Sequence, residues 1–269
     1  MISTITQSPP SSTFSQGCLS FVRAMSCGGS RRERLWSNPS IVRFRRSLPA
    51  ASRPRVLVVH VGGTEIEMID LLHNMQFFIV AGHETTALLL AWALLLVAND
   101  EAVRSRARAE AKAAIGNRPA TADDLARSPY IEQILQETLR LYPPVALLAR
   151  NVIAPDQIYD REIRPGDTVF LNIYSLHRHH LWWENPNAFE PDNFTPQKVA
   201  ARDRYLHLPF GAGARICIGA NFAMMQAQII LTTLLSRFSF HPAGPAPTPV
   251  MHMTVRPEPG VWLEFTPDA

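Results

Sequence analysis

Cysteine and lysine are both scarce in this sequence of 269 residues. Its three cysteines, Cys18, Cys27 and Cys217, are too few for the disulfide framework of a small secreted domain, so we expect a reducing compartment. Of the 26 basic residues only two are lysines, a bias typical of a GC-rich bacterial genome. The longest uninterrupted apolar run, residues 87–98, has 12 residues, whereas a bilayer span needs about 20. We therefore expect no membrane span.

Acidic residues are almost absent from the first segment. Residues 1–60 carry nine arginines and a single acid, Glu33, which gives them a net charge of +8, while residues 61–269 carry −5. Because the basic bias is confined to this segment, the rest of the chain offers no nucleic-acid surface. An Arg-rich and Ser-rich composition with few acids is typical of an organellar transit peptide or of a disordered, unrelated extension. We expect the extension, and we place a domain boundary at residues 60/61.

Several enzyme motifs are also missing. There is no GxSxG, no Walker A and no GxGxxG motif, which removes support for hydrolase, NTPase and dinucleotide-fold interpretations. His83-Glu84 does not begin a zinc-protease motif, because position 87 is alanine. The histidine-rich run HRHH at 177–180 has no partner at metal-ligand spacing.

The order of breakers and apolar runs predicts a mainly α-helical fold with minor β structure. No proline occurs between Pro54 and Pro119, which permits one or two helices over 65–98. Capping residues predict further helices after Asp100, after Thr121 and from Ser128 to Tyr142. We expect a turn and strand over 164–174, a loop over 175–210, a helix over 220–238 and a final hairpin near VWLEF.

The stretch FGAGARICIG, residues 210–219, is the most specialised part of the chain. Cys217 comes just before a predicted helix, whose first N–H groups and positive dipole end stabilise a thiolate. Arg215 adds a positive charge, and the glycines let the backbone approach a flat or bulky group. The alternative for a lone cysteine is an inert, buried side chain.

This stretch matches the pattern F-x-x-G-x-R-x-C-x-G at every fixed position: Phe210, Gly213, Arg215, Cys217 and Gly219. It resembles the haem-binding signature of the cytochrome P450 family, the haem-thiolate monooxygenases. The resemblance implies a haem (heme, iron protoporphyrin IX) cofactor with Cys217 as the axial ligand to iron. It further implies that Arg215 binds a haem propionate, that Phe210 packs beside the sulfur and that Gly213 and Gly219 shape the loop under the porphyrin.

Two further motifs follow the same family's order. ETLR at 137–140 resembles the family's E-x-x-R helix, in which Glu137 and Arg140 form a structural pair; taken alone, it is a common surface ion pair. AGHETT at 81–86 interrupts an otherwise apolar helix. Taken alone it is a helix kink, but it resembles the family's A-G-x-[DE]-T-T motif. Ala81 and Gly82 would then leave room for O₂, and Glu84 and Thr85 would relay protons.

Some residues match the family's pattern only weakly, and one, Asn193, departs from it. Arg150 is placed like a second propionate ligand, although a solvated surface arginine fits its position equally well. Phe77, Val80 and residues 145–148 would line a substrate pocket, although apolar residues at such places are more often part of the core. Asn193 stands where the family has arginine, so we expect the Glu137–Arg140 pair to lose its third member.

The resemblance covers residues 65–269 and only the C-terminal half of the family's fold, so we expect a truncated product whose central helix exposes apolar surface. It implies an oxidoreductase acting on a small apolar organic substrate, with electrons from a ferredoxin or flavoprotein. The scarcity of cysteine and lysine, and not the resemblance, leads us to expect a cytoplasmic, bacterial location. Two alternatives stay open: a non-catalytic remnant that binds haem weakly or not at all, and a peroxidase-like haem protein.

Overall fold

The computed structural model of the chain describes residues 43–45, 58–61 and 64–268, and the chain divides into two compact units, Met1–Met75 and Gln76–Ala269. The extension expected over residues 1–60 lies outside the described residues except for two short strands. In the first unit three strands form an antiparallel sheet in the order β1-β2-β3: β1 (Arg43–Arg45), β2 (Val58–Val61) and β3 (Thr64–Glu67).

Helix α2 (Met68–Asn99) is a single helix of 32 residues, where the sequence allowed one or two. It is the one helix of the described residues that is long and apolar enough, by length and composition, to cross a membrane, and only 22% of its apolar window is buried. Polar residues such as Glu84 divide this helix into shorter apolar runs, so its longest uninterrupted run of 12 residues understates its apolar length. As expected, apolar side chains of α2 are exposed: Phe77 is 65% and Val80 74% accessible.

The next three helices begin and end where their capping residues predict. The side chain of Asp100 accepts a hydrogen bond from the N–H of Val103 at the start of α3 (Glu101–Ile115), and Gly116 ends that helix with a positive φ of 56°. The 3₁₀ helix η1 (Ala122–Arg127) has the predicted capping box of Thr121 and Asp124. Helix α4 (Pro129–Leu141) begins with proline after Ser128.

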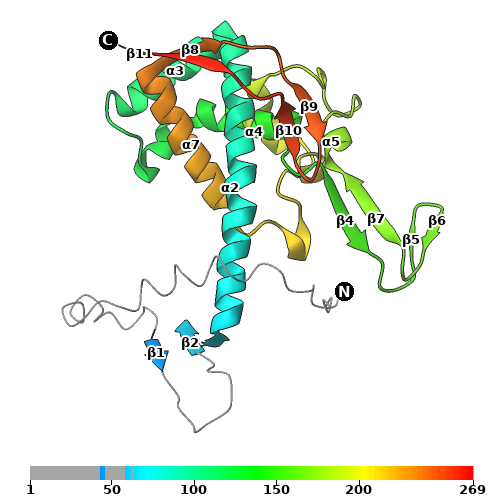
Figure 1. Ribbon diagram of the computed structural model, residues 1–269. Coiled ribbons are helices and arrows are strands. Elements are labelled where there is room, and N and C mark those ends of the chain that lie inside the picture. The colour runs from blue at the N-terminus through cyan, green and yellow to red at the C-terminus, as the bar shows by residue number, and fades with distance from the viewer. Residues whose placement is uncertain (1–42, 46–57, 62–63, 269) are drawn as a thin grey trace. The chain divides into compact units, whose positions relative to one another are not determined.

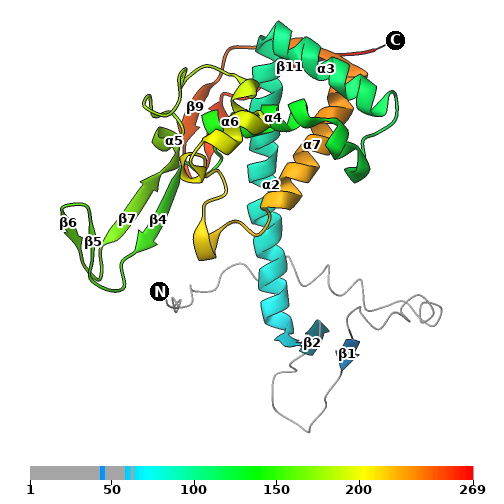
Figure 2. The ribbon, with the colours of Figure 1, turned by 180° about the vertical axis from the view of Figure 1, so that it is seen from behind.

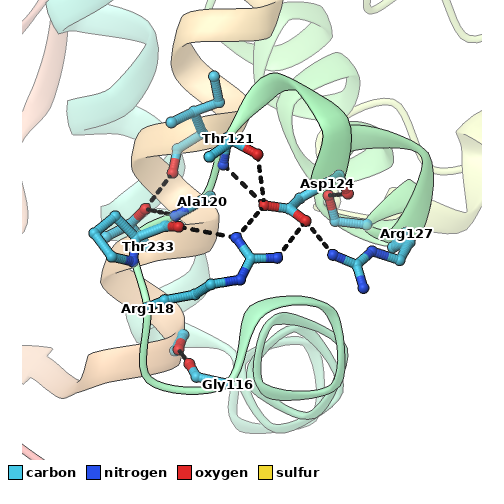
Figure 3. Close-up of polar contacts among 11 residues, drawn as sticks. Gly116, Arg118, Ala120, Thr121, Asp124, Arg127 and Thr233 are labelled. Carbon is cyan, nitrogen blue, oxygen red and sulfur yellow. Dashed lines mark hydrogen bonds and ion pairs between the residues drawn. The ribbon is translucent and has the colours of Figure 1, made fainter.

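Asp124 is the centre of a polar cluster at the start of η1 (Figure 3). Its side chain is 2% exposed and accepts hydrogen bonds from both terminal nitrogens of Arg118, at 2.6 and 2.7 Å. The backbone N–H and the hydroxyl of Thr121 donate to Oδ2 at 2.9 and 3.0 Å, and Arg127 donates to Oδ1. These donors, Arg118 foremost, hold the pKa of Asp124 well below the ordinary carboxyl value. The cluster therefore fixes the connection between α3 and α4.

We expect Asp124→Asn to lower the midpoint of thermal unfolding by several degrees, because the amide cannot accept from both arginines and removes their counter-charge. The contribution of the Asp124 carboxylate to the free energy of unfolding is fully present above the ordinary pKa of 3.8. It decreases as the pH falls below that value. Circular dichroism at pH 7 and pH 3 measures both effects. Asp123→Asn, at the exposed neighbour, is the matched control. Equal midpoints for the two variants at pH 7 would contradict the prediction.

One hydrophobic cluster joins α2, α3, α4 and α7 (Ala220–Arg237). Leu89, Ala93 and Val97 from the C-terminal half of α2 lie in this cluster with Ile131 of α4 and Leu231 of α7. Figure 2 shows α4 crossing α2 and α7 lying beside it. Burial of these apolar side chains of α2 contributes to the stability of the second unit.

The described strands of the second unit form four two-stranded sheets rather than one minor sheet. The β4–β7 pair continues into the β5–β6 pair as an arm (Figure 1). The hairpin predicted near VWLEF is wrong, because the last strand pairs with the strand that follows α7 and the local hairpin is β9–β10. The strands are β4 (Leu147–Asn151), β5 (Asp156–Ile158), β6 (Arg161–Ile163), β7 (Thr168–Asn172), β8 (Phe238–Pro242), β9 (Thr248–Met251), β10 (Val255–Glu258) and β11 (Leu263–Pro267).

The region predicted as a loop over 175–210 contains short helices. Prolines begin two of them, since proline suits the first helical position even where it prevents a long helix. The short helices here and in the following segment are α5 (Ile173–Leu176), η2 (Pro191–Phe194), α6 (Pro196–Ala201), η3 (Arg204–Leu206) and η4 (Gly213–Arg215).

Candidate functional site

Cys217 lies on an irregular segment, residues 207–219, which we call the Cys217 loop and which leads directly into α7. Its thiol is free and exposed. The N–H of Cys217 donates to the carbonyl of Phe210 at 2.9 Å, and the carbonyl of Cys217 accepts from Ala220 N–H at 3.4 Å, at the first turn of α7. The loop thus presents an exposed thiol directly before the first turn of α7.

Two glycines of the loop adopt backbone angles that other residues rarely reach. Gly211 and Gly213 both have φ of 72°. A Cβ at Gly211 would come within 3.5 Å of Leu148, whereas one at Gly213 would meet nothing within 4 Å. At Gly219 a Cβ would lie 3.9 Å from the sulfur of Cys217. At Gly219, therefore, no side chain occupies the space beside the thiol.

Phe210 and Arg215 lie differently around the loop. The ring of Phe210 packs against the main hydrophobic cluster and so anchors the loop to the helices. Arg215 ends η4, is exposed, and makes no hydrogen bond or ion pair with any described residue. Its guanidinium is free to bind an anion.

Glu137 and Arg140 form a fully buried pair on α4, each side chain 0% exposed. Two parallel hydrogen bonds join them, Nε to Oε2 and Nη2 to Oε1, both at 2.7 Å. Arg140 also donates to three backbone carbonyls, at His177 (3.0 Å), Pro186 (2.7 Å) and Ala188 (2.8 Å). Burial raises the pKa of Glu137, and the hydrogen bonds from Arg140 oppose that rise. The pair is an internal brace for the segment between α5 and η2.

The expectation that Asn193 deprives this pair of a third member is wrong. The side-chain amide of Asn193 donates to Glu137 Oε1 at 3.3 Å, and the N–H of Glu190 donates to the same oxygen at 2.9 Å. Arg202 donates to the carbonyl of Asn193 at 2.6 Å and lies over the ring of Trp183, 4.1 Å from its centroid. The side chain of Asn193 thus contacts Glu137 directly, and Arg202, which follows α6, binds the backbone carbonyl of Asn193.

The polar residues that interrupt α2, Glu84 and Thr85, both make hydrogen bonds. The hydroxyl of Thr85 donates to the carbonyl of Ala81 at 2.8 Å, one turn earlier in the helix. The carboxylate of Glu84 accepts from the Thr254 hydroxyl at 2.6 Å and from Arg256 at 2.7 and 2.9 Å. These donors, Thr254 first, lower the pKa of Glu84, so the carboxylate is charged at neutral pH. No spacing rule in the sequence pointed to Thr254 or Arg256, which lie on or beside β10.

His177 is a buried polar residue, which the sequence singled out only as part of the HRHH run and without a predicted role. It lies at the end of α5, and its ring is 4.9 Å from that of His207, measured between centroids. Burial lowers the pKa of His177 to about 4 and that of His207 well below its ordinary value. Both rings are therefore neutral at pH 7.

The residues around Cys217 and at the polar interruption of α2 fit a flat, apolar, iron-containing group. Ile216 and Ile218 flank the thiol and are 57% and 84% exposed. On α2, Ala81 and Gly82 are exposed, and a Cβ at Gly82 would meet nothing within 4 Å. A soft sulfur donor, apolar faces and the unpaired cation of Arg215 match the iron, ring and carboxylates of haem.

Other predicted site residues are placed less distinctively. Arg150 lies on β4, where its Nη1 donates to the carbonyl of Ala149 at 2.8 Å. Of the expected pocket residues, Leu147 borders a cavity near β9 and β10, lined otherwise by Asn172, Tyr174, Pro249, Met251 and Val255. No hydrogen bond joins α2 to the Cys217 loop in the described part of the chain.

Comparison with known proteins gives a consistent result. The family model described as "Cytochrome P450" matches residues 41–265, so the match begins 20 residues before our domain boundary. The chain is 32% identical to human Cytochrome P450 4V2, over 76% of this chain and 39% of that protein. It is 34% identical to a cytokinin hydroxylase of Arabidopsis thaliana, over 73% of this chain and 39% of that protein.

A solved structure is similar as well. The crystal structure of the cytochrome P450DA heme domain has a TM-score of 0.73 and 31% sequence identity, covering 77% of this chain and 47% of that chain. The chain therefore spans about two fifths of the length of the curated relatives it matches.

Proposed function

Because this chain belongs to the cytochrome P450 family, we propose that it binds haem through the thiolate of Cys217 and forms the haem-binding part of a monooxygenase. The reaction inserts one oxygen atom from O₂ into an apolar organic substrate. The observation that carries the proposal is the exposed, free thiol of Cys217, set among small and apolar residues just before α7.

The haem iron, when bound, supplies the chemistry that activates O₂. Cys217 holds the group as a thiolate, and the helix dipole of α7 stabilises that charge. Arg215, which has no partner among the described residues, binds one propionate. Arg150, whose guanidinium now donates to the Ala149 carbonyl, would bind the second. Gly213 and Gly219 allow close approach of the ring.

Residues of α2 would hold and move protons for the group once it is bound. Ala81 and Gly82 leave space there because they have little or no side chain. Thr85 carries a movable proton on Oγ1, and this hydroxyl now donates a hydrogen bond to the Ala81 carbonyl. Glu84, fixed by Thr254 and Arg256, is the charged acceptor through which that proton is replaced from solvent.

We further propose that electrons come from a ferredoxin or flavoprotein at the side of the Cys217 loop, and that the protein works in a bacterial cytoplasm. Exposed apolar side chains on α2, such as Phe77 and Val80, favour a second candidate, a chain that holds haem weakly and has no turnover.

The experiment that tests the proposal is optical. The purified, monodisperse chain is mixed with haem, reduced and exposed to CO, and we expect the red-shifted Soret band of thiolate-ligated iron. Thr85→Ala is the matched control, because its hydroxyl is not a ligand, and it should give the same band. A folded sample that binds haem without this band would overturn the ligand assignment, and one that binds no haem would favour the second candidate.

A further inference from the structure

His177 touches both the buried pair of α4 and the Cys217 loop. Its ring nitrogen Nε2 lies 2.8 Å from the backbone nitrogen of Leu208, which donates a hydrogen bond to it. Since Nε2 accepts, it carries no proton, and the neutral ring has its proton on Nδ1. The side chain of His177 is 0% exposed, and its hydrogen bond with Leu208 is partly buried.

The backbone of the same residue binds the buried pair. The carbonyl of His177 accepts from Arg140 Nη1 at 3.0 Å, and Arg140 is held by Glu137. On the loop side, the carbonyl of Leu208 accepts from Gly211 N–H at 3.1 Å, and Phe210 accepts from Cys217 N–H at 2.9 Å. A series of hydrogen bonds therefore runs from α4 through His177 into the loop that carries the thiol.

We propose that His177 is a positioning residue for Cys217: its neutral imidazole fixes the start of the Cys217 loop to the Glu137–Arg140 pair and so holds the thiolate where it can bind iron. The inference rests on the proposed function, because it gives His177 a role in haem ligation.

The surroundings of His177 keep its ring in the accepting form. The ring of His207 lies beside it. The backbone of Leu139 and Arg140 favours a proton on His177, whereas the guanidinium groups of Arg140 and Arg178 oppose one. Burial acts in the same direction and is the largest cause of its pKa of about 4. Around pH 7 the acceptor on Nε2 is therefore always available to Leu208.

Two variants separate the acceptor from the volume of the side chain. His177→Gln places a carboxamide oxygen where Nε2 lies and can accept from Leu208. His177→Leu fills similar space but leaves the Leu208 N–H without a partner. In the reduced CO complex we expect His177→Gln to keep the thiolate band. In His177→Leu the share of bound haem with that band should fall roughly tenfold, as expected for the loss of one half-buried hydrogen bond.

A measurement without haem keeps the inference testable if His177→Leu does not fold. Nitrogen chemical shifts of the His177 ring in the unmodified protein at pH 7 should report a neutral ring with the proton on Nδ1. A proton on Nε2 would overturn the inference. So would an unchanged thiolate band in folded His177→Leu. If the unmodified chain binds haem without any thiolate band, the proposed function fails instead, and the ring nitrogen measurement still decides whether His177 holds the loop.

Discussion

Replacing Cys217 with serine is expected to abolish the thiolate Soret band completely. A serine hydroxyl stays protonated near neutral pH and offers a hard oxygen in place of the soft, charged sulfur that iron binds. The substitution removes one exposed atom and no packing, so the loop contacts from Cys217 N–H to Phe210 and from Ala220 N–H to the Cys217 carbonyl should persist. The reduced CO spectrum measures the ligand, and circular dichroism measures the fold.

The chain offers its own control for this substitution. Cys18 and Cys27 are the two remaining cysteines, and replacing both with serine should leave the thiolate band unchanged. Loss of the band in this double variant, or its persistence in Cys217→Ser, would show that another thiol ligates the iron.

Arg140→Met is expected to destabilise the fold by about 3–5 kcal/mol, the usual cost of breaking a buried ion pair by removing one partner. The variant leaves the Glu137 carboxyl buried without its main donor, and it strips the carbonyls of His177, Pro186 and Ala188 of theirs. At pH 7 we expect the chain to be largely unfolded, or stable only with Glu137 protonated. Denaturant unfolding followed by circular dichroism measures the loss.

The matched variant removes both charges. Glu137→Leu combined with Arg140→Met no longer leaves a carboxylate alone in the core, so it should recover part of the lost stability. The three carbonyls stay without donors, which makes full recovery impossible. A double variant as unstable as Arg140→Met would mean that the carbonyl contacts, and not the ion pair, account for the stabilisation.

Local chemistry made much of the helical framework predictable. Asp100, Gly116 and Thr121 mark helix ends through contacts within a few residues, so the sequence around them was sufficient. The last strand was predicted wrongly because β11 pairs with β8, across a connection whose length no local pattern specifies. The short helices between 173 and 206 were missed because prolines were taken only as helix breakers.

The candidate site divides in the same way. Cys217, Arg215 and the glycines lie within ten residues of one another, so their match to the family's signature could be recognised from the sequence, and the haem-thiolate loop stays a prediction from that resemblance. His177, Thr254 and Arg256 act through contacts with residues 31 to 172 positions away. No period or motif links such distant residues, so only the folded chain reveals them. Asn193 was expected to leave Glu137 without a partner because it lacks the charge of arginine. Its amide nevertheless donates to Glu137, which depends on the backbone geometry of the folded chain.

The contact between Glu84 and Arg256 has a consequence for the order of synthesis. The two residues are 172 positions apart, and the indole of Trp92 likewise donates to the carbonyl of Val255, 163 positions later. At about 5–20 residues per second, a ribosome needs roughly 10 to 35 s to deliver these partners after α2 has formed. During that time a largely apolar helix carries an unpaired carboxylate and an unpaired indole, and nascent chains are open to capture by chaperones until β10 arrives.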